Sequence, residues 1–219
     1  MPIQAVIFDM DGVLIDSYQA HWQSWLDAAE SEGVRCDPTE FAKMFGRTSR
    51  EIIAHFWGEG RCSATEVAAI DAQKEAAFRE IINTDFPAMP GAADLLRTLH
   101  RVGFRLAVGS SGPPENVELV VDRLGVRDLF SVLVTGCDVV RGKPDPQVFL
   151  LAAERLNVSP TCCAVVEDAP AGVAAANAAG MFSIGLLSTG RTPSDLKAAG
   201  AVIRSLSEIT PQMLQSASR

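Results

Sequence analysis

The hydrophobic positions along the chain follow two periodic patterns. Short apolar runs of strand length occur at residues 6–8, 104–109, 132–135, 164–166, 182–187 and 201–203. From residue 90 onward, most of these runs alternate with segments whose apolar residues recur at helical spacing. Strands that alternate with helices are typical of βαβ units, which build a parallel sheet. We therefore expect an α/β fold with a parallel sheet.

Residues 17–89 differ, because their apolar residues keep helical spacing throughout and no run predicts a strand. The expected helices cover residues 18–33, 38–45, 49–57 and 64–83. Asp16 and Ser17 offer a cap for the first helix, and Thr48 with Glu51 has the spacing of a capping box. The sequence thus predicts a Rossmann-like, three-layer core made of residues 1–16 and 90–219, into which an all-helical domain of residues 17–89 is inserted.

Polar side chains gather where the predicted strands end. In a parallel sheet the carboxyl ends of the strands share one edge, and ligands of open α/β sheets bind there. The residues concerned are Asp9 and Asp11 after the first strand, Ser110 after the second, Lys143 beyond the third, and Glu167 and Asp168 after the fourth. The pattern predicts that three or four carboxylates, one hydroxyl and one ammonium group converge on a small volume.

These groups suit phosphoryl transfer assisted by a hard cation. Neighbouring carboxylates repel one another unless a cation or a shared proton intervenes, and Mg2+ prefers oxygen ligands. A carboxylate can attack phosphorus while a lysine and a hydroxyl hold the phosphoryl oxygens, and the helix expected near Pro114 can add backbone amides. Taken alone, Asp9 and Asp11 are equally consistent with turn and helix-cap residues, a role that Asp favours.

Composition narrows the functional classes. The chain has 219 residues, is 47% hydrophobic and carries a net charge of -8. This charge argues against a nucleic-acid partner, and no apolar run approaches the length of a membrane span. The five cysteines form an odd set without metal-ligand spacing, so we expect reduced thiols. Since the first residues do not resemble a signal peptide, we expect a cytoplasmic protein, monomeric or, as the alternative, dimeric.

The strand-end groups resemble the four signature motifs of the haloacid dehalogenase superfamily, in the same order along the chain. These motifs are Asp9-Met10-Asp11-Gly12-Val13, Ser110, Lys143-Pro144 and Glu167-Asp168. The helical insert lies where the superfamily places a helical cap domain, and the resemblance covers essentially the whole chain. It implies that Asp9 is the nucleophile that becomes an aspartyl phosphate and that Asp11 is the general acid and base.

The resemblance also implies roles for the remaining groups at the sheet edge. Ser110 and Lys143 correspond to the phosphate-binding pair. Ser111 competes with Ser110, which the strand register favours, and we keep Ser111 as a substrate-binding candidate. The implied ligands of Mg2+ are Asp9, Asp168, the backbone carbonyl of Asp11, and Glu167. For Glu167 an alternative stays open, since it can instead cap the helix that begins at Pro170.

Candidates for substrate recognition lie in the helical insert. Lys74 falls on the apolar stripe of the helix expected at 64–83, where a lysine usually extends its ammonium group to solvent. Arg50 lies in the first turn of its helix, where a cation opposes the helix dipole unless it meets an anion. His21 also fits a plain core position. The resemblance to the β-phosphoglucomutase and phosphoglycolate phosphatase subgroup implies that the substrate-binding residues of the insert are His21, Gly46, Arg50 and Lys74.

The function expected from these observations is a Mg2+-dependent phosphatase that hydrolyses a small phosphomonoester, either a sugar phosphate or phosphoglycolate. The alternative is a β-phosphoglucomutase-type phosphomutase, in which a second sugar hydroxyl accepts the phosphoryl group. Mutases continue with a polar phosphate-contacting stretch after the residue that matches Ser110, whereas this chain has Gly112-Pro113-Pro114, which favours the phosphatase. An alternative of another class is a non-catalytic phosphosugar-binding regulatory module, although pure binding does not require the intact Asp9.

Overall fold

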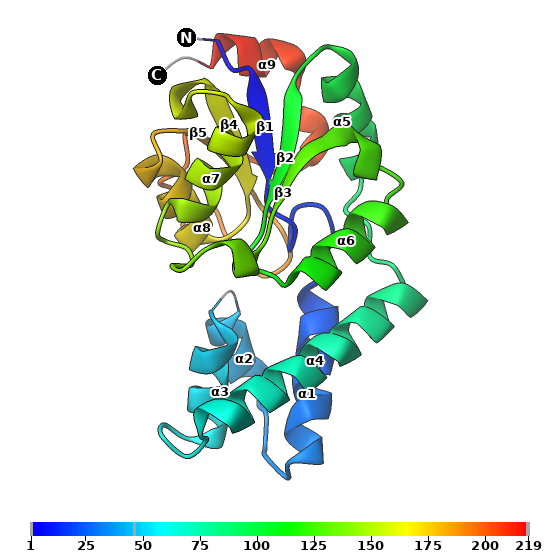
Figure 1. Ribbon diagram of the computed structural model, residues 1–219, viewed down its shortest axis with the longest axis vertical. Helices are drawn as coiled ribbons and strands as arrows, with labels where there is room; N and C mark the ends of the chain where they lie inside the picture. The colour runs from blue at the N-terminus through cyan, green and yellow to red at the C-terminus, as the bar shows by residue number, and fades with distance from the viewer. Residues whose placement is uncertain (1, 46, 218–219) are drawn as a thin grey trace. The chain divides into compact units, whose positions relative to one another are not determined.

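The structure is a computed structural model that describes residues 2–45 and 47–217. The chain divides into two compact units, one formed by Met1–Asp16 with Ala88–Arg219 and the other by Ser17–Pro87. The first is an α/β unit and the second is built from helices (Figure 1). The second boundary lies between Pro87 and Ala88, compared with residues 89 and 90 expected from the sequence. The assignment of the helical unit as a cap domain stays a prediction.

A six-stranded parallel sheet forms the centre of the α/β unit. Its strands are β1 (Ala5–Phe8), β2 (Arg105–Gly109), β3 (Phe130–Val134), β4 (Cys163–Glu167), β5 (Phe182–Leu186) and β6 (Ala201–Ile203). They are arranged in the order β3-β2-β1-β4-β5-β6, and every neighbouring pair is parallel. The predicted α/β fold is therefore confirmed.

Helices cover both faces of this sheet (Figure 1). They are α5 (Ala92–Arg101), α6 (Pro114–Arg123), α7 (Gln147–Leu156), α8 (Pro170–Ala178) and α9 (Pro211–Ser216). On one face, Ile7 and Val165 pack with Phe149 of α7 in a buried cluster that also includes α8. Since side chains alternate along a strand, Val6 and Phe8 point to the opposite face, where α5 packs on β2. The sequence pattern did not indicate α9, because six residues span less than two helical turns.

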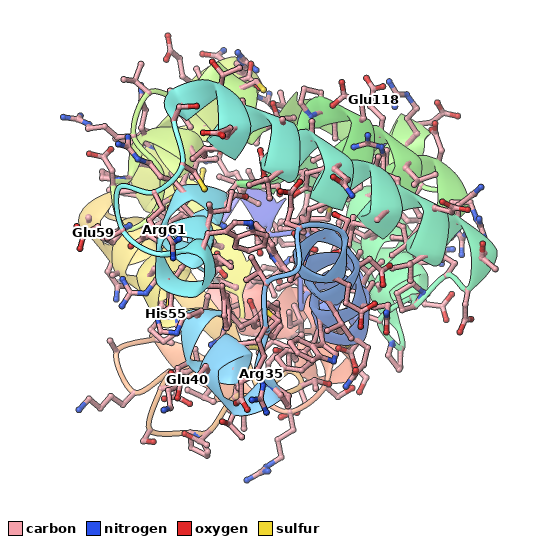
Figure 2. The ribbon with its side chains drawn as sticks, turned by 90° about the horizontal axis from the view of Figure 1, so that it is seen from below. Arg35, Glu40, His55, Glu59, Arg61 and Glu118 are labelled. Carbon is pink, nitrogen blue, oxygen red and sulfur yellow. The ribbon has the colours of Figure 1, made fainter. Side chains whose placement is uncertain are left out.

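The helical unit contains α1 (Tyr18–Ser31), α2 (Pro38–Met44), α3 (Ser49–Trp57) and α4 (Ala64–Thr84). Its buried core consists of Trp25, Ala28, Ala29, Phe41, Ile52, Ile53, Trp57 and Ile70. At its surface, His55 of α3 lies 3.5 Å from Glu40 of α2 (Figure 2). Of the helices in the described ranges, none is both long enough and apolar enough to span a bilayer.

The two predicted helix caps of this unit have different outcomes. Thr48 and Glu51 form the expected capping box at the start of α3. Ser17 is the N-cap residue of α1, but its side chain makes no capping hydrogen bond. The Ser17 side chain is fully buried. The predicted side-chain cap at the start of α1 is therefore absent.

Candidate active site

The strand order reverses at β1, and this reversal creates the site. The chain runs from β1 through β2 to β3 on one side and then returns to β4 on the other, so the carboxyl ends of β1 and β4 flank a topological switch point. The register pairs Phe8 with Val166, and the Asp9 N–H donates to the Val166 carbonyl at 2.9 Å. Backbone pairing alone therefore brings Asp9 beside the end of β4.

A buried carboxylate cluster lies at this switch point. Asp9, Glu167 and Asp168 each offer one oxygen, and these atoms all lie within 4.8 Å of one another. The Lys143 ammonium group bridges two of them, at 2.7 Å from Asp9 Oδ1 and 2.7 Å from Glu167 Oε2. Its nitrogen lies 4.9 Å from the centre of the Phe149 ring. The Lys143 side chain is only 9% exposed. Residues that follow β1, β3 and β4 thus meet in one buried cluster, as predicted from the strand ends.

The pKa values of Asp9 and Lys143 are both raised, for different reasons. Burial is the largest cause for Asp9 and raises the pKa of its carboxyl group well above the ordinary value, Glu167 raises it further, and Lys143 lowers it. For Lys143, burial lowers the pKa, but the negative charges of Asp9 and Glu167 outweigh it and hold the pKa above its ordinary value. Lys143 therefore stays a cation at neutral pH.

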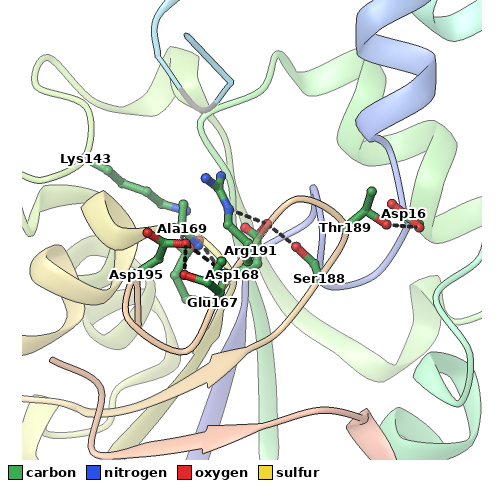
Figure 3. A network of polar contacts seen from close by, with 10 residues as sticks. Asp16, Lys143, Glu167, Asp168, Ala169, Ser188, Thr189, Arg191 and Asp195 are labelled. Carbon is green, nitrogen blue, oxygen red and sulfur yellow. Dashed lines mark hydrogen bonds and ion pairs between the residues drawn. The ribbon is translucent and has the colours of Figure 1, made fainter. Parts of the chain in front are cut away.

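Asp168 is held by the segment that follows β5 (Figure 3). The Ser188 hydroxyl donates to Asp168 Oδ2 at 2.7 Å, and Arg191 Nε lies 3.5 Å from the same oxygen. Burial is the main cause that raises the pKa of Asp168 to about 7, with a further contribution from Glu167, while Arg191 and Ser188 lower it. Sequence reasoning missed Ser188 and Arg191, although the strand-end rule extends to β5, whose carboxyl end lies at the same edge.

Glu167 is fixed by backbone amides on one oxygen and by Lys143 on the other. Its Oε1 accepts hydrogen bonds from the N–H groups of Asp168 at 3.1 Å and Ala169 at 3.0 Å. The Ala169 residue is the N-cap of α8, so Glu167 contacts the start of this helix and also belongs to the carboxylate cluster. The assignment of Glu167 as a metal ligand stays a prediction.

The hydroxyl candidates at the end of β2 have different environments. Ser110 is 1% exposed and its Oγ accepts the Gly112 N–H at 3.0 Å, whereas Ser111 is exposed. Pro113 is the N-cap of α6 and Pro114 opens the helix, and neither has an N–H group to donate. The N-terminus of α6 therefore offers two fewer N–H groups to an anion than was expected from the sequence.

Asp11 lies close to the cluster without belonging to its buried part. Its side chain is partly exposed, and its negative charge contributes to the raised pKa of Asp9. Gly12 follows with a positive φ of 73°, and a Cβ at this position would overlap the Asp168 carboxylate. The Asp9-to-Val13 turn therefore packs its backbone directly against Asp168, which explains why glycine follows the second aspartate.

In the helical unit, the structure brings Lys74 and His21 together. Lys74 is 3% exposed, and its ammonium group lies 2.9 Å from His21 Nδ1 and 2.7 Å from Glu75 Oε1. Because an ammonium group only donates, Nδ1 of His21 accepts. The His21 ring stacks on Phe78 with 4.1 Å between ring centres. The alternative in which Lys74 extends its ammonium group to solvent does not hold, because its partners His21 and Glu75 lie inside the unit.

The other two candidates of the helical unit are not part of this pair. Arg50 is exposed in the first turn of α3. Gly46 lies outside the described residues. Contact of Arg50, Gly46, His21 and Lys74 with a substrate stays a prediction.

A parallel sheet with a buried carboxylate cluster and a bridging lysine at its switch point defines an α/β enzyme. The sequence profile of haloacid dehalogenase-like hydrolases matches residues 3–180. The chain belongs to this family and is an enzyme of the haloacid dehalogenase superfamily.

Individual relatives match almost the entire chain. It is 35% identical over 210 residues to validoxylamine A 7'-phosphate phosphatase of Streptomyces hygroscopicus subsp. limoneus, a match that covers 94% of this chain and 95% of the relative. It is 33% identical over 218 residues to β-phosphoglucomutase of Bacillus subtilis strain 168, covering 97% and 94%. The solved structure of β-phosphoglucomutase from Clostridium difficile superposes with a TM-score of 0.86 at 27% identity, covering 97% and 96%. Both units therefore take part in the similarity.

Proposed function

We propose that this protein is a Mg2+-dependent phosphatase that hydrolyses a small sugar phosphate through an aspartyl phosphate on Asp9. The observation that carries the proposal is the buried ammonium group of Lys143, 2.7 Å from both Asp9 and Glu167. A fixed cation beside a carboxylate nucleophile suits a reaction in which negative phosphoryl oxygens must approach that carboxylate. The similarity to a phosphatase and to a phosphoglucomutase supports this class of substrate.

The carboxylate cluster fits a hard divalent cation. Asp9, Glu167 and Asp168 would hold Mg2+ through carboxylate oxygens, the ligands that this ion prefers, with the backbone carbonyl of Asp11 as a further ligand. Lys143 and Arg191 place two positive charges against three carboxylates, so negative charge remains when all three are ionised. When bound, Mg2+ offsets the charge of the phosphoryl oxygens and orients them.

Each side chain at the sheet edge has a different role in the proposed reaction. Lys143 and the Ser110 hydroxyl hold phosphoryl oxygens, which places phosphorus against the Asp9 carboxylate. Asp9 attacks phosphorus, the bond from phosphorus to the alcohol oxygen breaks, and Asp11 protonates this leaving oxygen. Asp11 then accepts a proton from water as the water attacks the aspartyl phosphate. Inorganic phosphate leaves and the Asp9 carboxylate is restored.

A phosphomutase is the second candidate, and it shares the aspartyl phosphate. The 33% identity to β-phosphoglucomutase of Bacillus subtilis supports it, and His21 and Lys74 are its candidate sugar-binding residues. Pro113 and Pro114 favour the phosphatase, since they remove two amide donors near Ser110. The two candidates differ in the acceptor, which is water in the phosphatase and a sugar hydroxyl in the mutase.

The test measures phosphate release from p-nitrophenyl phosphate, hexose phosphates, hexitol phosphates and phosphoglycolate, with and without Mg2+. Conversion of β-glucose 1-phosphate to glucose 6-phosphate is followed in parallel. We expect Mg2+-dependent phosphate release that falls by at least about a thousandfold in Asp9→Asn, because this variant lacks the nucleophile.

The matched control is Asp94→Asn, which makes the same change at a side chain of α5 that is 91% exposed. This variant should retain wild-type activity. Full activity of Asp9→Asn, or of the wild type in excess chelator, would contradict the mechanism. Conversion of β-glucose 1-phosphate without release of phosphate would identify the mutase.

A further inference from the structure

The segment between β5 and β6 contributes two side chains to the sheet edge that the proposed reaction leaves without a role. Ser188 donates its hydroxyl to Asp168 Oδ2 at 2.7 Å, and Arg191 Nε lies 3.5 Å from the same atom (Figure 3). The Arg191 side chain is 12% exposed and that of Asp168 is 4% exposed. A largely buried arginine therefore lies beside a carboxylate of the proposed metal site.

The position of Arg191 is set by its own segment. The Arg191 N–H donates to the Ser188 carbonyl at 3.1 Å, which closes a turn. Thr189, inside this turn, donates its hydroxyl to Asp16 Oδ2 at 2.7 Å (Figure 3). Hydrogen bonds to Asp168 and Asp16 thus anchor the turn on two sides, and the guanidinium group is placed before any ligand arrives.

The two contacts differ in their effect on a cation. Both are made to Oδ2 of Asp168. The Ser188 hydroxyl is neutral, so it orients the carboxylate without opposing a cation. The guanidinium group of Arg191 carries a positive charge, and like charges repel across a few ångströms in a site of reduced dielectric constant.

We propose that Arg191 is a positioning residue that sets the affinity of this site for Mg2+, because its charge competes with the ion for Asp168, while Ser188 holds the carboxylate in the orientation that binds it. The inference rests on the proposed metal site and assigns the segment after β5 a function in it. Arg191 acts through Asp168 and makes no contact with the reacting atoms in this scheme.

The test is isothermal titration calorimetry of MgCl2 into the chelator-treated full chain. The uncharged variants Arg191→Gln and Arg191→Met should bind Mg2+ about tenfold more tightly than the wild type, because a repulsive charge is removed. Arg191→Lys keeps the charge and should stay within about threefold of the wild type. Ser188→Ala should bind about threefold more weakly, since the carboxylate loses the hydrogen bond that orients it.

The matched control is Lys197→Gln, which removes one positive charge from an exposed position of the same segment. It should bind Mg2+ like the wild type. The thermal unfolding midpoint without Mg2+ is measured for every variant, and two uncharged variants of different shape are compared because Arg191 is largely buried.

Three results would overturn the inference. Unchanged or weaker Mg2+ binding by the folded uncharged variants would show that Arg191 does not compete with the ion. An equal gain in Lys197→Gln would show an effect of net charge alone. Absence of Mg2+ binding by the wild type would contradict the proposed metal site itself, and the inference with it.

Discussion

Two carboxylates of the site pack directly against glycine residues. Gly172 of α8 lies so close to Glu167 that a Cβ there would overlap the carboxylate. Gly12 has the same relation to Asp168. In both places the backbone of one element packs against a carboxylate of another element. This close packing restricts the conformation of the acidic side chain.

Gly172→Ala tests this contact. We expect the free energy of unfolding to fall by about 1–3 kcal/mol, because the new methyl group displaces Glu167 from Lys143, even though alanine is the better helix former. Urea denaturation of the metal-free protein measures the change. Gly142→Ala is the control, since no atom of the described residues lies within 4 Å of its added Cβ, and it should stay within about 0.5 kcal/mol of the wild type. Wild-type stability of Gly172→Ala would contradict the close contact.

The helix α4 buries a lysine on its apolar face. The helical spacing of its apolar residues predicted a buried stripe that contains Lys74, and the structure buries Ile70, Lys74, Phe78 and Ile82. The pattern of α4 alone could not show the hydrogen-bond partner of Lys74. This partner, His21, belongs to α1 and contacts Lys74 because the two helices pack together. A lysine that sequence statistics assign to the surface is therefore buried with two polar partners.

Lys74→Met separates recognition from stability. Because this variant removes one partner of a buried ion pair and leaves the Glu75 carboxylate, we expect the unfolding free energy to fall by about 3–5 kcal/mol, and urea denaturation measures this loss separately from the kinetics. If Lys74 recognises the substrate, kcat/KM should fall at least about tenfold more for a hexose phosphate than for p-nitrophenyl phosphate, as expected for a lost charge-assisted hydrogen bond. Steady-state kinetics on both substrates measure the ratio.

Two further variants complete this experiment. In Arg50→Ala, kcat/KM should likewise fall more for the hexose phosphate than for p-nitrophenyl phosphate. The control Lys43→Met removes a lysine of α2 that is 69% exposed, and it should leave kcat/KM unchanged for both substrates. Equal losses on both substrates in Lys74→Met and Arg50→Ala would mean that these residues do not distinguish the sugar.

The α/β unit is assembled from two stretches of chain, Met1–Asp16 and Ala88–Arg219, which the helical unit separates in sequence. The carboxylate cluster joins these stretches, since Asp9 comes from the first and both Glu167 and Asp168 come from the second. A cation bound by all three would therefore link the first strand to the remainder of the sheet and stabilise the folded chain as a unit.

Mg2+ should accordingly raise the unfolding midpoint of the protein. At a free concentration about one hundred times its Kd, a ligand that binds only the folded state adds about 2.7 kcal/mol to the free energy of unfolding. Differential scanning calorimetry with MgCl2 and with excess chelator measures the shift. KCl at matched ionic strength is the control, and an equal shift with KCl would show a general salt effect instead of a site.

Much of this architecture follows from local rules that act along the chain. Strand-length apolar runs, helical spacing and capping boxes depend on neighbouring residues, so β1, β4 and the four helices of residues 17–89 were predictable. The strand-end groups were predictable as well, because parallel strands bring their carboxyl ends to one edge whatever their order. The convergence of Asp9, Lys143 and Asp168 therefore follows from the sequence pattern alone.

The sequence by itself therefore determined the parallel sheet, through apolar runs that alternate with helical segments, and the helical insert, through unbroken helical spacing in residues 17–89. It also determined which polar groups converge on the edge of the sheet. Tertiary packing alone decided the strand order that sets β1 beside β4, the burial of Lys74 against His21, and the approach of Arg191 to Asp168. These contacts join elements that are remote along the chain, and their energies depend on which faces and ends meet, which no local pattern of residues contains.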